Sequence, residues 1–201
     1  MIKLTQKKNF VLREFKLSES KLFYNLVKYG NGNEVDIPYE NIDGEKVRSS
    51  TTNYLLFVVA IGCLALTIGI GYIGVMTTEV DLYFLAICFG VLAFGVFVYY
   101  WFTRETYWKI KLSNNTYIHF LQNVPDEETT EKFISELIKS RDIYLRDNYF
   151  VIDENLNYVD QLQNFRWLKS INAITKKEFD EKYSELKKLV KPEVGDIGFG
   201  K

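Results

Sequence analysis

Two long uncharged apolar segments constrain what this chain can fold into more than any other feature of its sequence. They run over Tyr54–Met76 and Leu82–Phe102, and residues 77–81 join them. The hydrocarbon core of a bilayer is about 30 Å thick, which about 20 helical residues can cross. Neither segment has the polar stripe of a helix that lies along an interface or lines a soluble core. The sequence therefore predicts a transmembrane helical hairpin over residues 54–102.

The charged residues around the two segments predict how the hairpin is oriented. The connecting loop carries Glu79 and Asp81 and no basic residue, whereas lysine and arginine lie beyond the other ends of the segments. These flanking basic residues are Lys46, Arg48, Arg104, Lys109 and Lys111. Since basic residues accumulate on cytoplasmic flanks, we expect both termini in the cytoplasm and two spans in the inner (cytoplasmic) membrane. Residues 1–10 lack the apolar run of a cleavable signal peptide, so the first span is expected to direct targeting itself.

The five flanking basic residues allow two interpretations. They can bind anionic lipid headgroups, each contributing on the order of 1 kcal/mol near the surface, or they can serve only to set the topology. The second interpretation is favoured. Over the whole chain, 25 basic and 26 acidic residues nearly cancel, which gives no sign of a nucleic-acid partner. The lipid bilayer is the first partner that we expect.

The segment before the hairpin has the composition of β-strands. Residues 10–17 and 21–29 are rich in β-forming residues, with a serine-rich turn between them. Residues 30–33 hold the glycines and asparagines of a second turn, after which residues 34–37 resume the extended pattern and Pro38 ends it. We expect the aliphatic and aromatic side chains of these strands to form the core of a sheet.

The segment after the hairpin has the pattern of two paired strands followed by a helix. Apolar and polar residues alternate over residues 106–120, and an amphipathic helix with an acidic start follows from about residue 126 to 146. Packed helices lie about 8–10 Å apart, so strands from both flanks of the hairpin can join one sheet. We therefore predict an α+β membrane protein in which residues 1–53 and 104–146 form one cytoplasmic domain. It would be a small antiparallel β-sheet with a capping helix, interrupted by the hairpin.

This pattern resembles the bacterial pleckstrin-homology-like (PH-like) membrane proteins over most of residues 10–146. The residues that carry the resemblance are Tyr24–Tyr29, Ile37–Ile42 and the closing strand pair with its helix. Proteins of that family often have transmembrane helices inserted in such a domain. The resemblance implies a partly open small barrel, and it supplies no catalytic residues.

The C-terminal region has the pattern of a short helical pair. Residues 147–160 are expected to be a linker, residues 161–190 two short helices and residues 191–201 a tail. Asn172 can adopt the left-handed conformation that ends the first helix. The second helix is expected to begin with a capping box at Thr175–Glu178.

The helical pair resembles the short C-terminal domain called SHOCT, which is found at the ends of many bacterial proteins. The matching residues are Leu168, Ile174, Thr175, Glu178, Phe179 and the lysine- and leucine-rich run to Leu189. Asn172 stands where that family usually has glycine, and Ala173 where a larger aliphatic residue is common. About thirty residues bury too little surface to be stable alone, so their exposed apolar side chains would seek a second copy or the neighbouring domain. The residues expected to dock this partner are Phe165, Trp167, Phe179 and Tyr183.

The sequence shows no motif that carries chemistry. It lacks a glycine-rich phosphate loop, a nucleophile elbow and a metal-spaced set of histidines and cysteines. Cys63 and Cys88 lie inside the spans as small apolar residues. His119, the only histidine, lies in a predicted strand and belongs to no recognisable catalytic motif. We therefore predict no enzyme, no cofactor and no metal site.

Two functions stay open at this point. The favoured one is a non-enzymatic, membrane-anchored binding or scaffolding module, whose C-terminal helices bind a protein partner or form a homo-oligomer. The alternative is a pore-forming or membrane-disrupting effector that oligomerises through the hairpin. Small residues four apart, at Ala65 and Gly69 and again at Ala86 and Gly90, motivate the alternative. The absence of a polar pore lining in the two segments argues against it.

Overall fold

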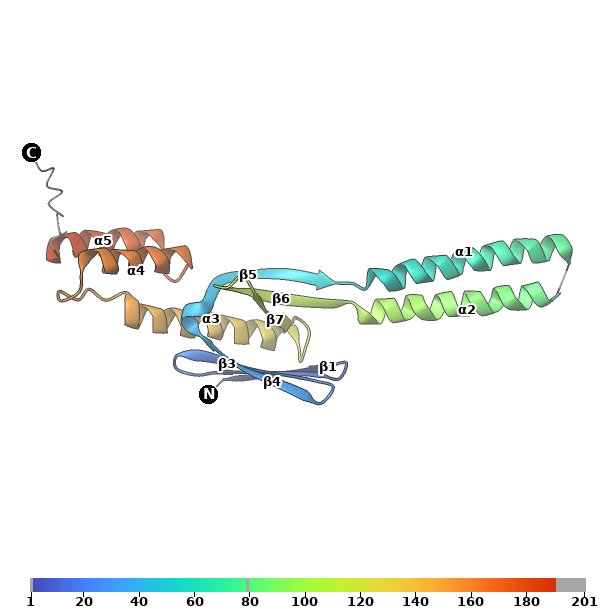
Figure 1. The fold of residues 1–201 in the computed structure, drawn as a ribbon, viewed down its shortest axis with the longest axis horizontal. Helices are drawn as coiled ribbons and strands as arrows, with labels where there is room; N and C mark the ends of the chain where they lie inside the picture. Colours follow the sequence, from blue (N-terminus) through green and yellow to red (C-terminus); the bar gives the residue numbers. More distant parts are fainter. Residues whose placement is uncertain (1, 79, 191–201) are drawn as a thin grey trace, which may run out of the picture. The chain divides into compact units, whose positions relative to one another are not determined.

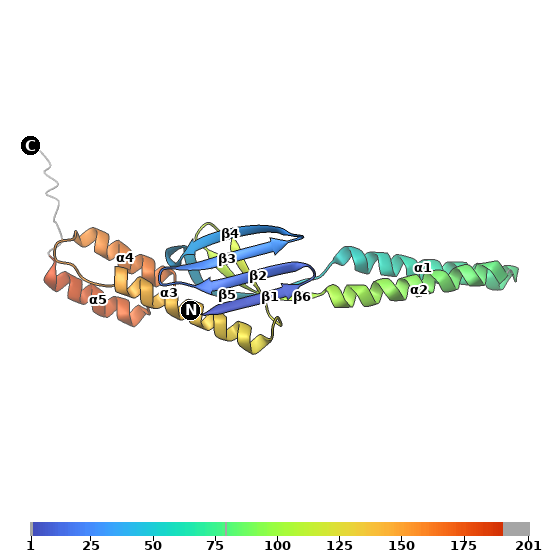
Figure 2. The same ribbon diagram turned by 90° about the horizontal axis from the view of Figure 1, so that it is seen from below.

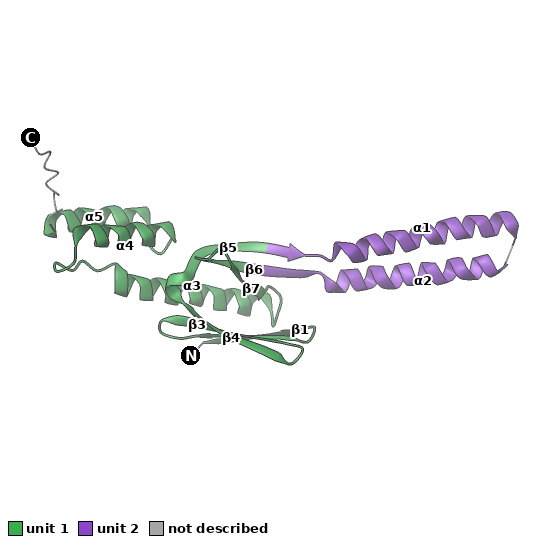
Figure 3. Cartoon of the chain, viewed as in Figure 1, with its two compact units in different colours: residues 1–48, 108–201 green, residues 49–107 purple. Residues whose placement is uncertain are grey.

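The computed structural model describes residues 2–78 and 80–190, within which the chain is an α+β protein (Figure 1). These residues form seven β-strands in two antiparallel sheets, together with five α-helices. The chain divides into two compact units, shown in Figure 3. Unit 1 comprises Met1–Arg48 and Trp108–Lys201, and unit 2 comprises Ser49–Tyr107.

The first sheet is a meander of four strands in the order β1-β2-β3-β4. The strands are β1 (Lys3–Lys8), β2 (Val11–Leu17), β3 (Lys21–Lys28) and β4 (Asn31–Pro38). β2 and β3 confirm the two strands predicted before the hairpin, and Pro38 ends β4 as expected. The prediction of a turn over residues 30–33 is wrong in its extent, because Lys28 pairs with Asn31 and β4 already begins there.

The second sheet has three strands in the order β5-β6-β7. They are β5 (Ile42–Thr51), β6 (Glu105–Leu112) and β7 (Tyr117–Leu121), and a short 3₁₀ helix, η1 (Tyr39–Asn41), precedes β5. β6 and β7 confirm the strand pair predicted after the hairpin. The sequence does not predict β5, because most of its residues are polar and it lies at the edge of the sheet, largely exposed.

β1 is also absent from the sequence predictions, and a buried glutamine explains how it is held. Gln6 Oε1 accepts a hydrogen bond from the Leu121 amide at 2.8 Å, and Gln6 Nε2 donates to the Leu121 carbonyl at 2.8 Å. The same Nε2 donates to the Val124 carbonyl and, at 3.2 Å, to Thr130 Oγ1. One fully buried side-chain amide therefore joins β1 of the first sheet to β7 of the second.

The main hydrophobic core of unit 1 lies between the sheets and α3 (Glu127–Tyr149), which confirms the predicted capping helix. The ring of Phe15 lies 4.4 Å from that of Phe120 and 6.1 Å from that of Phe133, centroid to centroid, and all three side chains are buried. The N-terminus of α3 is capped as its acidic start suggests. The Asp126 carboxylate accepts a hydrogen bond from the Thr129 amide at 2.7 Å, and this bond holds the pKa of Asp126 below its ordinary value.

Two helices follow α3, at slightly different boundaries from those predicted. α3 runs on to Tyr149 and α4 (Tyr158–Ser170) begins inside the predicted linker, so the connection between them is shorter than residues 147–160. α5 (Lys176–Leu189) begins with the predicted capping box at Thr175 and Glu178, and Asn172 has the expected left-handed conformation, with φ of 59°. The predicted tail at residues 191–201 lies outside the described residues.

Unit 2 contains the two apolar helices, α1 (Tyr54–Thr77) and α2 (Val80–Thr103). The connection between them is shorter than the predicted loop over residues 77–81, because the helices include Thr77 and begin again at Val80. Both are long and apolar enough to cross a membrane, and only 11% of the most apolar window of each is buried. The residues that the two helices bury are small: Ala60, Gly74, Ala86 and Ala93. Close packing of the two helices therefore rests on small side chains.

Candidate functional site: basic residues and the helical-pair interface

Two of the five flanking basic residues lie around one tryptophan of unit 1. Lys46 Nζ is 3.7 Å from the ring centroid of Trp108, and the Arg48 guanidinium is 5.9 Å from it. Lys46 also forms an ion pair with Glu131 of α3, with Nζ 3.2 Å from Oε1. Lys46 thus makes two contacts within its own unit: a cation–π contact with the ring of Trp108 and an exposed ion pair with the Glu131 carboxylate.

The other three basic residues do not join this cluster. Lys109 and Lys111 alternate with Trp108 and Ile110 along β6, so they point to the opposite face of that strand. Arg104 is exposed and belongs to unit 2, between the end of α2 and the start of β6. Within unit 1, the side chains of Lys109 and Lys111 therefore lie on the other face of β6 from Trp108, around which Lys46 and Arg48 gather.

His119 lies on β7, as the sequence predicts, with its side chain near two cations. Although His119 is exposed, desolvation by the atoms around its ring lowers its pKa, and the charges of Lys109 and Arg13 lower that pKa further. The neutral imidazole is therefore favoured at pH 7, which makes His119 a poor candidate for an anion-binding cation.

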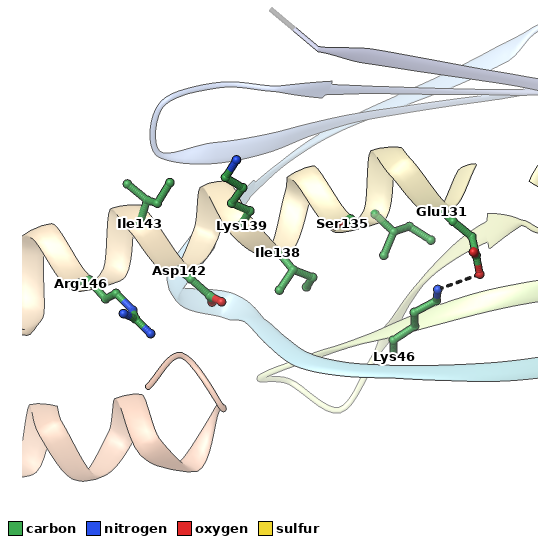
Figure 4. A pocket seen from close by; sticks show the side chains of 9 residues that line it. Lys46, Glu131, Ser135, Ile138, Lys139, Asp142, Ile143 and Arg146 are labelled. Carbon is green, nitrogen blue, oxygen red and sulfur yellow. Dashed lines mark hydrogen bonds and ion pairs between the residues drawn. The ribbon is translucent and has the colours of Figure 1, made fainter. Parts of the chain in front are cut away.

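An open groove runs along α3 beside Lys46, and Figure 4 shows the side chains around it. Its volume is about 570 Å³. Its apolar lining comes from Ile134, Ile138 and Ile143, and its charged lining from Lys46, Glu131, Lys139, Asp142 and Arg146. The lining is mixed in sign and open to solvent, so the groove favours no single class of small molecule.

The four residues expected to dock a partner lie in or beside the interface between the C-terminal helical pair (α4 and α5) and the end of α3. The ring of Phe165 is fully buried and packs edge-on against Phe150 at 5.3 Å between centroids, so Phe165 is not available at the surface of the folded chain. Trp167 packs edge-on against Tyr149, also at 5.3 Å. Both aromatic side chains therefore contact the last residues of α3 and the residue that follows it. The sequence alone could not predict these contacts, because the spacing of apolar residues shows which face of α4 is buried but not which segment packs against that face.

The other two predicted docking residues stack on each other in α5. The rings of Phe179 and Tyr183 are 5.8 Å apart with an interplanar angle of 11°. Lysines cover both rings, with Lys169 Nζ 4.8 Å from the Phe179 centroid and Lys187 Nζ 4.2 Å from that of Tyr183. Lys187 also lowers the pKa of Tyr183 through a side-chain hydrogen bond. Both rings remain partly exposed at the surface of the helical pair.

Arg141, which the sequence marks only as an interruption of the apolar face of the predicted helix, joins β5 to the end of α4. Its side chain is fully buried, and its Nη1 and Nη2 donate to the carbonyl oxygens of Ile42 and Ile171, each at 3.2 Å. The guanidinium also pairs with Asp142, at 2.6 Å between Nη2 and Oδ1. Burial raises the pKa of the Asp142 carboxyl, and the charge of Arg141 opposes that rise. The available signal was a lone arginine on the apolar face of the predicted helix.

Three further hydrogen bonds join the end of α3 to the loop between α4 and α5 (residues 171–175) and to the first turn of α5. Arg146 donates to the Ala173 carbonyl at 3.1 Å and forms a two-pronged pair with Glu178, at 2.8 and 3.3 Å. Gly44 of β5 passes so close to this loop that a Cβ atom there would lie 2.8 Å from the Ile171 carbonyl oxygen.

Close to Arg141 along α3, one carboxylate accepts hydrogen bonds from two tyrosines. Glu40 Oε1 accepts hydrogen bonds from the hydroxyls of Tyr144 and Tyr149, at 2.9 and 3.2 Å. The hydrogen bond to Glu40 raises the pKa of Tyr144. The C-terminal half of α3 therefore connects η1 and β5 to the helical pair through polar contacts.

Among the described residues, no group of three or more histidine, cysteine, aspartate or glutamate side chains is placed to hold a metal ion. Cys63 and Cys88, both in unit 2, are free thiols. Comparisons of the chain with protein-family models, with curated proteins and with solved structures found no match.

Proposed function

We propose that the chain is a non-enzymatic, membrane-anchored binding or scaffolding module. In this proposal α1 and α2 span the inner membrane with both termini in the cytoplasm, and unit 1 is a PH-like domain at the inner leaflet. The C-terminal helical pair, of the SHOCT type, is then a fixed part of the cytoplasmic body that presents a surface to a partner. This proposal assigns no catalytic role to any residue.

The observation that carries the proposal is the contrast between the two units. In unit 2 the two apolar helices leave most of their large side chains exposed, including Leu55, Ile68 and Phe94, each at least 66% exposed. In unit 1 large apolar side chains gather in buried clusters. Exposed apolar surface on this scale is unfavourable in water and is accommodated in lipid.

The proposal can be tested on the full chain in native membranes. Extraction with alkaline carbonate should leave the chain in the membrane pellet, and release into the supernatant would contradict a two-span anchor. Single cysteines introduced by Thr78→Cys and Asn114→Cys, in a chain lacking Cys63 and Cys88, test the topology. A membrane-impermeant thiol reagent added to intact cells should label the first position and not the second.

A second candidate function is assembly of several copies through α1, which would serve a membrane-disrupting effector. The observation that favours it is the open space beside Gly62 and Gly69 of α1, where a Cβ atom would meet nothing within 4 Å, and Ala65 between them is exposed. Small residues at this spacing permit close helix association in membranes. Leakage of a trapped dye from liposomes after reconstitution would support the effector, and intact liposomes with a monomeric chain would exclude it.

A further inference from the structure

The two hairpin turns at one end of the first sheet each place an aromatic side chain at their tip. Lys8 pairs with Val11 and Lys28 pairs with Asn31, so the turns consist of Asn9-Phe10 and Tyr29-Gly30. Phe10 is 84% exposed and Tyr29 is 74% exposed. We call these two residues the aromatic tips.

Both aromatic tips occupy backbone positions that do not suit them. Phe10 has φ of 61° and Tyr29 has φ of 51°, whereas glycine, asparagine and aspartate are the residues usually found at positive φ in two-residue turns. Neither ring is buried, so packing inside unit 1 does not account for the choice of residue. A strained and exposed aromatic residue at two neighbouring turns indicates a contact outside the unit.

The strand order places both tips at the end of unit 1 from which the chain leaves for unit 2. β1, β3 and β5 run toward the same end of the unit, as Figures 1 and 2 show. The β1–β2 turn, the β3–β4 turn and the departure of the chain after Arg48 therefore share this end. Five residues, 49–53, separate Arg48 from the first residue of α1, and an extended chain of that length spans about 20 Å at most.

The turns at the opposite end of the sheets have a different composition. The β2–β3 connection is Ser18-Glu19-Ser20, and the β6–β7 turn is built on Ser113-Asn114-Asn115. Neither contains an aromatic or basic residue. The aromatic tips, by contrast, follow lysines directly, at Lys7-Lys8 and at Lys28, and Lys28 Nζ lies 5.7 Å from the Tyr29 ring centroid.

Acidic residues also occur at the end that carries the tips, where α3 begins. Asp126 caps the helix through the Thr129 amide, and Glu127 accepts a hydrogen bond from Gln122. These carboxylates are thus engaged by the start of α3 and its preceding loop. The tips themselves combine aromatic rings with lysines, which is the pairing that favours the headgroup layer of an anionic membrane.

We infer that the aromatic tips Phe10 and Tyr29 enter the headgroup layer of the membrane that α1 and α2 cross, with Lys7 and Lys28 facing anionic lipids. This inference rests on the proposed function, because it requires that unit 2 be inserted in a bilayer. Its consequence is that unit 1 is held at the membrane at the tips as well as through the chain connections.

Single-cysteine labelling of the full chain tests the inference. In a chain carrying Cys63→Ala and Cys88→Ala, the variants Phe10→Cys and Tyr29→Cys are labelled with a fluorophore that responds to polarity. Glu19→Cys and Asn114→Cys, at the opposite end of the sheets, are the matched controls. Each protein is reconstituted into vesicles of phosphatidylcholine and phosphatidylglycerol, with and without lipids that carry a shallow nitroxide quencher in both leaflets.

The inference expects the two tip labels to emit at shorter wavelength than the control labels and to be quenched several-fold more strongly by the nitroxide lipids. Equal emission and equal quenching at all four positions would overturn it. Carbonate extraction of the same vesicles separates the two proposals. A chain that is released fails the proposed function, whereas a chain that stays integral with unquenched tips fails this inference alone. Circular dichroism of each variant verifies that unit 1 has kept its fold.

Discussion

Replacing Gly44 by alanine is expected to loosen the contact between the C-terminal helical pair and the rest of unit 1. The new Cβ atom would lie 2.8 Å from the Ile171 carbonyl oxygen and 2.9 Å from Arg141 Nη1. The first is a backbone atom that accepts from Arg141 Nη2, and the second belongs to a fully buried side chain and donates to the Ile42 carbonyl, so neither can move without weakening one of these hydrogen bonds. Overpacking of this kind costs about 1–3 kcal/mol, and removing a glycine from a strand offsets about 0.5–1 kcal/mol of that. The free energy of unfolding should therefore fall by up to about 2.5 kcal/mol.

Gly32→Ala is the matched control for this prediction. Gly32 also lies in a strand, β4, but the nearest atoms to its Cβ position are Val27 Cγ2 at 3.5 Å and Asn25 Oδ1 at 3.8 Å, which are ordinary contacts. Alanine at this position should leave the free energy of unfolding unchanged or raise it by up to about 1 kcal/mol.

The assay has two parts, both on the full chain in detergent micelles. Urea unfolding followed by tryptophan fluorescence gives the change in the free energy of unfolding, and hydrogen exchange measured by mass spectrometry gives local opening. Gly44→Ala should speed exchange in α4 and α5, and Gly32→Ala should not. If both variants unfold at the same urea concentration and exchange alike, the close approach of β5 to the Ile171 loop does not stabilise the helical pair.

Three further predictions follow from contacts in unit 1. Arg141→Met should lower the free energy of unfolding by about 3–5 kcal/mol in the same urea assay, because it leaves the buried Ile42 carbonyl and the partly buried Ile171 carbonyl without this donor, and Asp142 without its partner. A loss below about 1 kcal/mol would contradict this. Glu178→Gln should destabilise the chain at neutral pH and lose its effect in acid. Hydrogen bonds with Thr175 lower the pKa of Glu178 below its ordinary value of 4.5, and the charge of Arg146 lowers it further. The carboxylate therefore stabilises the fold above pH 4.5, and this stabilisation is lost as the pH falls through the lower pKa of the folded state. Urea titrations at several pH values measure this, and a difference between wild type and variant that persists unchanged in strong acid would refute it. Phe10→Gly should raise the free energy of unfolding by about 0.5–1 kcal/mol, since it relieves a positive φ without removing a buried contact, and a destabilised variant would show that the ring packs within unit 1.

The elements that sequence reasoning could predict are those whose own residues determine them. The two apolar helices, the amphipathic α3 and the capping box of α5 carry their signals within a few turns of chain, and all three were predictable. β1 and β5 carry no such signal. β1 is held by Gln6, a polar residue whose partners lie more than a hundred residues away, and β5 is a polar edge strand.

The candidate site was less predictable than the fold, because it depends on contacts between distant segments. The flanking lysines and arginines are visible in the sequence, but only coordinates show that Lys46 is engaged by Trp108 and Glu131 while Lys109 lies on another face. The spacing of apolar residues in α4 likewise did not show that Phe165 packs against Phe150. Arg141 illustrates the general difficulty. From the sequence alone an arginine within an apolar face would be expected to reach solvent, and only the coordinates show that it is buried and donates to two carbonyl oxygens.

The side chain of Gln6 has a consequence for how this protein avoids unwanted association. The Gln6 side-chain amide accepts a hydrogen bond from the Leu121 amide and donates one to the Leu121 carbonyl, as the backbone of a neighbouring strand would do. One side chain therefore takes the place of a paired strand residue between the two sheets. Exposed strand edges recruit other chains by the same hydrogen bonds. Here the backbone amide and carbonyl of Leu121 are already occupied by Gln6, so another strand could not pair with β7 at this residue without displacing that side chain.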